Sequence, residues 1–360
     1  MAIKAQDYTP AIKWRQGEYQ ALMRLPEAAK AKLRPLVIIP SIEYDFETGE
    51  PECSSHDHAT KFIKRYTAKW KTRVALIDID SSLHAEKVAG KTFVAYIFDA
   101  LRDAKAVAIP VISLDYDTAV IGDLAEAAGT DGNGICIRAR IEHLMHPLAD
   151  TRIAKLIAGI GVAPEEVDFL VDLGSPTYEP YAAFGKALLA ALSKLTSLKV
   201  YRTFTMLGTA FPETMPPGKS DSALKRHDWL FYKDFVKTLP EGFRRPLFGD
   251  YTTVHPAFKA DFDMRKIKPA GKVVYTTPED WLLRKGGAFR DNRAQMHDHC
   301  DKIVKSGKFK GGAFSEGDSY IERCAKKEPG AGPSNLSKWK EVGISHHIMQ
   351  VLDDVSKFHG

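Results

Sequence analysis

The fold is decided by one stretch, Arg73-Val74-Ala75-Leu76-Ile77-Asp78-Ile79-Asp80-Ser81, in which an apolar run ends in two carboxylates one residue apart. A short apolar run bounded by polar residues is typical of a parallel strand, because helices cover both faces of a parallel sheet. The carboxylates at its carboxyl end then lie where α/β folds place their functional sites. The stretch therefore predicts an α/β fold with Asp78 and Asp80 beside a site.

Strand-like segments of the same kind recur along the first 251 residues, with a helix-length segment between neighbours. The other seven are 8–13, 36–40, 106–114, 134–140, 167–172, 199–206 and 246–251. Eight strands at intervals of about 28 to 47 residues match the period of a closed parallel barrel. An open dinucleotide-binding sheet is less favoured, because the sequence contains neither GxGxxG nor GxxxxGK[ST]. We therefore predict a (β/α)₈ TIM-barrel-like parallel barrel.

The rhythm of alternating strands and helices breaks after residue 254. Residues 272–286 look like a hairpin with turn residues at 277–280, and 344–358 look like a closing helix. We therefore expect a barrel over residues 1–255 and a C-terminal extension, 256–360, that packs on it.

The bulk composition is that of an ordinary globular protein, with 44% hydrophobic and 27% charged residues in 360. A net charge of +5 permits an anionic partner without the concentrated basic face of a duplex-binding domain. The four cysteines are far apart and form no CxxC pair, so neither a disulfide framework nor a thiolate zinc site is indicated. No apolar run is long enough to span a bilayer, and we expect a cytoplasmic protein without a membrane partner.

In a barrel, the residues at the carboxyl ends of the strands converge on one mouth. The candidates at these positions are Lys13, Glu43, Asp78, Asp80, Asp115, Arg138, Arg140, Asp172, Thr205 and Asp250. Because alternate strand residues share a side, Asp78 pairs with Asp80, and Arg138 with Arg140. Mixed carboxylates and cations of this kind suit general acid–base chemistry or the binding of a phosphate. Some of the candidates could equally be solvated loop residues or helix caps.

A divalent ion such as Mg²⁺ would suit the carboxylates, since oxygen ligands favour it over zinc. The alternative is a salt-bridged layer inside the mouth that binds no metal. The histidines of His56-Asp57-His58 and His297-Asp298-His299 are two residues apart and do not face one another on a helix, so solvated histidines are the simpler interpretation. His255 follows the last strand and is either an acid or base near neutral pH or a turn residue bonded to backbone.

Two sets of motifs resemble a known family. The first is Tyr8-x-Pro10-x-Ile12-Lys13 with Gly17-Glu18-x-x-Ala21-Leu22 and Pro35-Leu36, and the second is Gly317-Asp318-x-x-Ile321-x-x-x-Ala325 with Trp339-x-x-Val342-Gly343-x-x-His346-His347-Ile348. In order and separation they resemble the opening and closing motifs of the phage and bacterial beta protein family. The resemblance implies a phage, mobile-element or antiviral-defence context and no particular reaction. It also places His346 and His347 at the start of the last helix, where they could pack, cap the helix or belong to the site.

The leading hypothesis is a hydrolase or transferase that acts on a phosphate-bearing small molecule or nucleotide at the mouth. Asp78, Asp80, Asp172 and His255 would be catalytic, and the substrate-binding residues would be Lys13, Glu43, Asp115, Arg138, Arg140 and Asp250. Arg138 and Arg140 would clamp the phosphate, because a guanidinium binds its oxygens in pairs.

Two alternatives stay open. One is a non-catalytic interaction protein with a protein partner in phage–host conflict. The other is a single-stranded nucleic-acid binder, since Trp281, Arg284, Phe289 and Arg290 interleave aromatic and basic groups.

Overall fold

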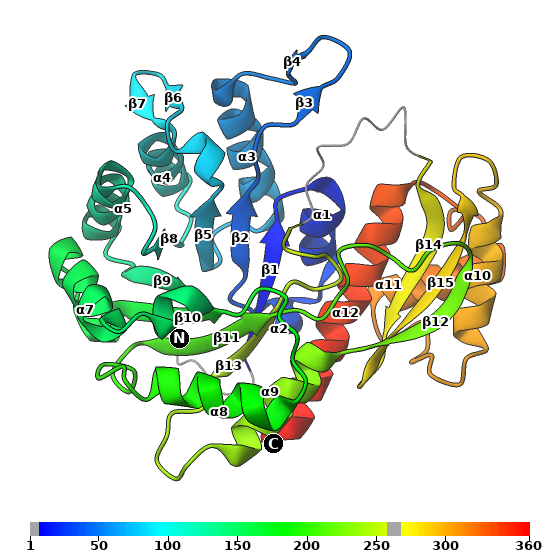
Figure 1. Ribbon diagram of the computed structural model, residues 1–360. Coiled ribbons are helices and arrows are strands. Elements are labelled where there is room, and N and C mark those ends of the chain that lie inside the picture. Colours follow the sequence, from blue (N-terminus) through cyan, green and yellow to red (C-terminus); the bar gives the residue numbers. More distant parts are fainter. Residues whose placement is uncertain (1–6, 258–267) are drawn as a thin grey trace.

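A computed structural model describes residues 7–257 and 268–360 and shows a closed eight-stranded parallel barrel with a smaller sheet beside it (Figure 1). Around the barrel the strands run in the order β1-β13-β11-β10-β9-β8-β5-β2. Their bounds are β1 Tyr8–Lys13, β2 Leu36–Ile39, β5 Ala75–Ile79, β8 Ala108–Ser113, β9 Ile135–Arg140, β10 Val167–Asp172, β11 Thr203–Gly208 and β13 Leu247–Asp250. The predicted barrel is confirmed, and each of its eight strands overlaps a predicted one.

Helices cover the outside of the barrel and the C-terminal part of the chain. Their bounds are α1 Gln16–Arg24, α2 Glu27–Lys30, α3 Ser55–Lys69, α4 Phe93–Asp103, α5 Thr118–Asp131, α6 Ile141–Met145, α7 Ala149–Ile160, α8 Tyr181–Leu192, α9 His227–Thr238, α10 Gln295–Val304, α11 Glu316–Ala325 and α12 Leu336–His359. Two short hairpins, β3 Tyr44–Asp45 with β4 Glu50–Pro51 and β6 Lys87–Val88 with β7 Lys91–Thr92, follow β2 and β5. In the described residues no helix is both long and apolar enough to cross a membrane.

Apolar side chains fill the barrel in two layers. Leu76, Cys136 and Leu170 belong to the core enclosed by the strands. Ile77 and Ile137, which alternate with them, pack outward against the helices. The strands read as continuous apolar runs because both of their faces are buried. Polar inward-facing groups are therefore expected only near the ends of the barrel.

The smaller sheet has the order β12-β15-β14 and is antiparallel. The predicted hairpin is present as β14 Ala270–Thr276 and β15 Asp280–Ala288. Its third strand, β12 Ser220–Lys225, comes from the connection that follows β11, where no strand was predicted. Along β12, partly buried side chains alternate with exposed ones, as expected for a strand with one face covered and the other in solvent.

Two elements cross the boundary predicted at residue 255. Strand β12 joins the smaller sheet, and α12 packs on the barrel through Ile344, Ile348 and Val351, which belong to the main core. Helix α12 also begins at Leu336, eight residues before the predicted start, where the side chain of Asn335 caps it by accepting from the Lys338 amide. In Figure 1 it lies beside α1, between the barrel and the smaller sheet.

Candidate functional site

Arg138 is the central side chain of the barrel mouth, by which we mean the carboxyl ends of the eight strands. Its Nε and Nη2 donate to Asp172 Oδ2 at 2.9 and 2.6 Å, and Nη1 makes an ion pair with Asp78. Tyr251 donates to Asp172 Oδ2 at 2.6 Å, and Tyr116 donates to Asp78 Oδ1 at 2.7 Å. Burial raises the pKa of both phenols, so they remain donors at neutral pH. Two carboxylates and one arginine that were predicted as site residues thus form a single network.

A cavity of about 280 Å³ opens beside this network. Its lining combines predicted site residues with hydroxyl and apolar groups, namely Lys13, Ile38, Asp78, Ile79, Asp80, Ser81, Ser113, Tyr116, Arg138, Arg140, Tyr251 and Pro256. Sequence reasoning missed Tyr116 and Tyr251. The signal was present, because each directly follows an aspartate at a strand end and, in the case of Tyr251, falls on the inward side of its strand.

Besides Arg140, the charged groups of the cavity that lie outside the Arg138 network are Lys13 and Asp80. Lys13 Nζ donates to the carbonyl oxygen of Pro256 at 2.7 Å, and burial lowers its pKa to about 8. Asp80 begins the short 3-10 helix Ser81–Leu83 and accepts from the Ser82 amide at 3.1 Å. The two groups are close enough for the charge of Asp80 to favour protonated Lys13. The cavity therefore holds a titratable amine beside a carboxylate.

Three further predicted site residues lie near the mouth but belong neither to the Arg138 network nor to the cavity lining. Asp115 pairs with Arg140 and is 2.8 Å from His143 Nε2. Glu43 is 3.5 Å from Arg15 Nε and is largely exposed. His255 Nδ1 accepts from the amide of Ala257 at 3.2 Å, and burial lowers its pKa. Of the two interpretations of His255, this contact supports the turn residue.

The placement of Asp250 at the mouth was wrong. Its carboxylate points out of the barrel, because the inward side of this strand belongs to its neighbour Tyr251. Asp250 accepts from Tyr8, from the Thr252 amide at 2.8 Å and from His347 Nε2 at 2.9 Å. It therefore joins the barrel to α12.

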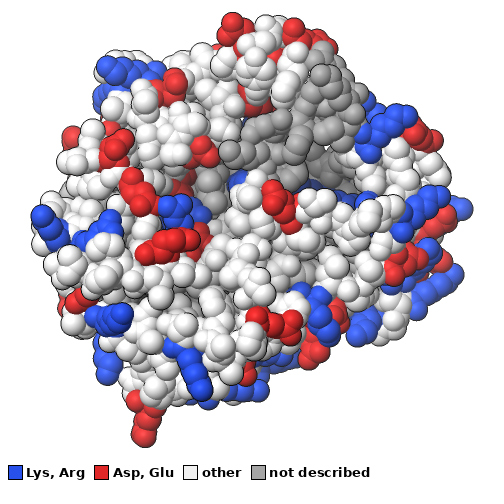
Figure 2. Space-filling model, viewed as in Figure 1, with Lys and Arg blue, Asp and Glu red and all other residues white. Residues whose placement is uncertain are grey.

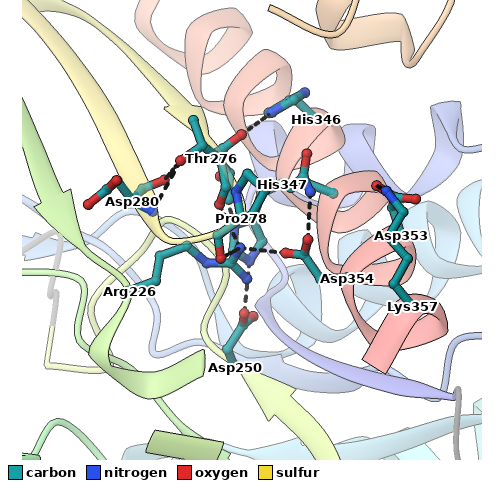
Figure 3. Close-up of polar contacts among 12 residues, drawn as sticks. Arg226, Asp250, Thr276, Pro278, Asp280, His346, His347, Asp353, Asp354 and Lys357 are labelled. Carbon is teal, nitrogen blue, oxygen red and sulfur yellow. Dashed lines mark hydrogen bonds and ion pairs between the residues drawn. The ribbon is translucent and has the colours of Figure 1, made fainter. Parts of the chain in front are cut away.

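His346 and His347 lie in the middle of α12, not at its start, and both are fully buried. His346 Nδ1 is 2.8 Å from Asp318, and its Nε2 donates to the Thr276 carbonyl at 2.7 Å (Figure 3). Arg226 reaches Asp354 on the same helix at 2.6 Å. These contacts hold the smaller sheet, the barrel and α12 together, which is the packing role among those expected for the pair.

Glycines of both motif sets contact α12. A Cβ on Gly17 would be 2.8 Å from the Ser337 carbonyl oxygen, and one on Gly317 would be 2.4 Å from that of Val342. Glu18 is 3.7 Å from Lys340 Nζ. The motif residues that lie far apart in the sequence therefore meet around one helix.

Among the described residues, no three His, Cys, Asp or Glu side chains gather in a way that could hold a metal ion. Asp78 and Asp172 both bind Arg138, which matches the salt-bridged layer that was the alternative to a Mg²⁺ site. Among the paired histidines, His58 Nε2 lies 2.9 Å from the Pro40 carbonyl oxygen, and His297 Nδ1 lies 2.6 Å from that of Cys324.

The aromatic side chains proposed for stacking on nucleic acid are buried. Trp281 is 0% exposed and packs edge-on against Phe211, and Phe289 is 4% exposed. Both rings face the interior because they lie on covered sides of the smaller sheet and its continuation. They offer no free face to a base, which removes this argument for a single-strand groove.

The fold and mouth define the class: a (β/α)₈ barrel whose carboxyl-end cavity carries lysine, arginine and aspartate. The chain belongs to the Beta protein family, whose model matches residues 8–353. Among solved structures, one match is alanine racemase from Clostridium difficile 630 in complex with cycloserine, with 11% identity and a TM-score of 0.33. That match covers 74% of this chain and 57% of the racemase chain. The comparison with curated proteins finds no match.

Proposed function

We propose that the chain is an enzyme, a hydrolase or transferase, that acts on a phosphate-bearing small molecule or nucleotide in the mouth cavity. The observation that supports this most is the convergence of Lys13, Arg138 and Arg140 with Asp80 in one cavity at the carboxyl ends of the strands. Active sites of barrels of this kind are built at that end.

The cations differ in what they can do. Arg138 is held on two sides by Asp78 and Asp172, so its guanidinium is fixed in position. Arg140 is 57% exposed and can turn toward a ligand. The guanidinium of Arg138 is fixed, and that of Arg140 is exposed with an exposed partner, Asp115. Together they suit a phosphate, whose oxygens accept paired N–H donors.

Lys13 and Asp80 supply the acid–base chemistry of the proposal. With a pKa of about 8, a fraction of Lys13 is neutral near pH 7 and can accept a proton from an attacking water or hydroxyl. Asp80 lies beside it and favours the return of the proton to the amine. Asp78 and Asp172 act through Arg138 as positioning residues. A divalent ion such as Mg²⁺ would enter with the phosphate of the substrate.

The test is a thermal-shift screen of inorganic phosphate, AMP and a hexose phosphate on the protein and its Arg140→Gln variant. A ligand that binds only the native state raises the melting temperature. We expect at least one probe to stabilise the protein and Arg140→Gln to lose that shift. The matched control is Arg152→Gln on α7, an exposed arginine away from the mouth, which should retain it.

A flat response to every phosphate-bearing probe, or equal shifts in the two arginine variants, would contradict the proposal. The interaction protein of phage–host conflict would then be the better hypothesis. It predicts that substitutions at the mouth leave biological activity intact.

A further inference from the structure

One face of the smaller sheet turns toward the loop that follows β11. On this face, Val274, Trp281 and Leu283 pack with Phe211 from that loop. Lys272 and Lys285 lie on the same face, because each is two residues from one of these apolar side chains. Lys285 Nζ also donates to the carbonyl oxygen of Pro216 in the loop. The face is thus apolar at one end and basic at the other.

The two lysines are directly opposite each other in the antiparallel register of β14 and β15. Like charges at opposed positions destabilise a sheet. Both side chains are only partly exposed, which weakens screening by water. Within residues 7–257 and 268–360, neither lysine forms an ion pair with a carboxylate. The pair is electrostatically unfavourable for the sheet alone.

The lysine pair belongs to a row of cations that leads to the mouth. Burial, together with the nearby charges of Lys340 and Lys285, lowers the pKa of Lys272 to about 8. The charge of Lys340 also acts on Lys13, which lines the mouth cavity. Figure 2 shows Lys and Arg side chains in the hollow between the barrel and the C-terminal elements. The row runs from Lys285 and Lys272 through Lys340, which lies 3.7 Å from the buried carboxylate of Glu18, to Lys13.

We propose that this row binds the phosphate chain of a nucleoside polyphosphate, with the rest of the ligand at the mouth cavity. The inference rests on the proposed function and adds the substrate class. A chain of several phosphates places negative charges in a line, as the lysines place positive ones. Lysine binds such oxygens as a compact point charge and needs no fixed fork geometry. Binding would relieve the repulsion between Lys272 and Lys285.

The test is isothermal titration of ATP, inorganic tripolyphosphate and AMP into the protein and its Lys272→Gln/Lys285→Gln double variant. We expect ATP and tripolyphosphate to bind more tightly than AMP. The double variant should lose roughly tenfold in affinity for the two polyphosphates per lysine removed, the scale of a charge-assisted hydrogen bond. Its affinity for AMP should be unchanged.

The matched control is Lys225→Gln on β12 of the same sheet, where the amine is 3.1 Å from Asp280 and already neutralised. This variant should bind ATP as the unmodified protein does. Binding of ATP with equal affinity to the double variant and the protein would overturn the inference.

Failure of the inference can be separated from failure of the proposed function. Arg140→Gln should weaken the binding of AMP and of ATP alike, since Arg140 lies at the mouth cavity that both ligands would occupy. If Arg140→Gln weakens the binding of both nucleotides and the double variant weakens neither, the lysine site is wrong and the proposed site at the mouth is retained. If the double variant weakens ATP binding while Arg140→Gln leaves both affinities unchanged, the lysine site is retained and the role of Arg140 at the mouth is wrong. Tighter binding of a short single-stranded oligonucleotide than of tripolyphosphate would also overturn the inference.

Discussion

Asp250 Oδ2 and His347 Nε2 are 2.9 Å apart, and both residues are completely buried between β13 and α12. His347 Nδ1 is also 2.9 Å from the Thr276 hydroxyl on the smaller sheet. One imidazole thus connects the barrel, the last helix and the sheet.

Replacing His347 by alanine should destabilise the protein strongly. Removing one partner of a buried pair leaves the other without compensation and costs about 3–5 kcal/mol in the free energy of unfolding. The control is Lys357→Ala on the same helix, whose exposed pair with Asp353 at 2.7 Å should contribute less than about 1 kcal/mol. Urea unfolding measures both. Equal losses in the two variants would show that the network does not hold α12.

The same histidine should make stability depend on pH. Burial lowers the pKa of His347, so the folded protein holds it neutral while the unfolded chain takes up a proton below about pH 6.5. Its contribution is therefore full above that pH and is lost as the pH falls. A conservative His347→Gln variant should show a flatter loss of stability between pH 7 and 5 in urea unfolding. A parallel pair of profiles would contradict the assignment.

Asp228 should have the opposite pH dependence. Burial and the charge of Asp250 raise its pKa to about 7, whereas the unfolded value is about 3.9. The folded protein keeps a proton that the unfolded chain has lost, so stability falls as the pH rises through this window. Asp228→Asn should therefore stabilise the protein at pH 8, by about 4 kcal/mol at most, and hardly at all near pH 4.

The control for Asp228 is Asp234→Asn on the same helix, which is less buried and should change stability by under about 0.5 kcal/mol. Urea unfolding at the two pH values gives the comparison. A destabilised Asp228→Asn at pH 8 would mean that the carboxylate is needed in its charged form.

Alanine at Gly317 should weaken the packing of α11 on α12. The new methyl would meet the Val342 carbonyl oxygen at 2.4 Å, and overpacking of this kind costs about 1–3 kcal/mol. The matched variant is Gly122→Ala in the middle of α5, where nothing lies within 4 Å of the added atom. That change should stabilise the protein by about 0.5–1 kcal/mol. Changes of the same sign in thermal unfolding would contradict the role given to Gly317.

Lys13 should make the binding of phosphate depend on pH. Burial lowers its pKa to about 8, so the amine is mostly protonated at pH 7 and mostly neutral at pH 9. Affinity for AMP should therefore fall as the pH rises through about 8, measured by titration calorimetry. Lys13→Arg, which stays charged, should remove the fall. A pH-independent affinity in the unmodified protein would exclude Lys13 from the binding site.

The barrel could be predicted from the sequence because each strand is an apolar run buried on both faces. The same logic brought Asp78, Arg138 and Asp172 together, since the carboxyl ends of parallel strands meet. The same logic failed for Asp250. Neighbouring residues of a strand face opposite sides, and because Tyr251 faces into the barrel, Asp250 faces out. A strand end gives a residue's position along the barrel axis, and only its register shows whether the side chain faces in or out.

The smaller sheet shows what local patterns leave out. Strand β12 is polar and short, and its partner β15 lies about sixty residues further along the chain. The residues near Ser220–Lys225 therefore give no local signal of a strand. The hairpin of β14 and β15 has its turn close by and was predicted. The start of α12 could have been found from Asn335, a typical capping residue whose side chain accepts from the Lys338 amide.

The parallel pairing of β1 with β13 joins Tyr8 to Phe248, and α12 closes over that seam from the far end of the sequence. During synthesis on a ribosome, β1 can pair early with β2, but its other edge must wait until β13, at residues 247–250, has been made. Pairings between such distant segments are slow to form, and waiting strands expose unsatisfied edges. We expect nascent chains of this protein to depend on chaperones until residue 359 has emerged, and chains released early to aggregate.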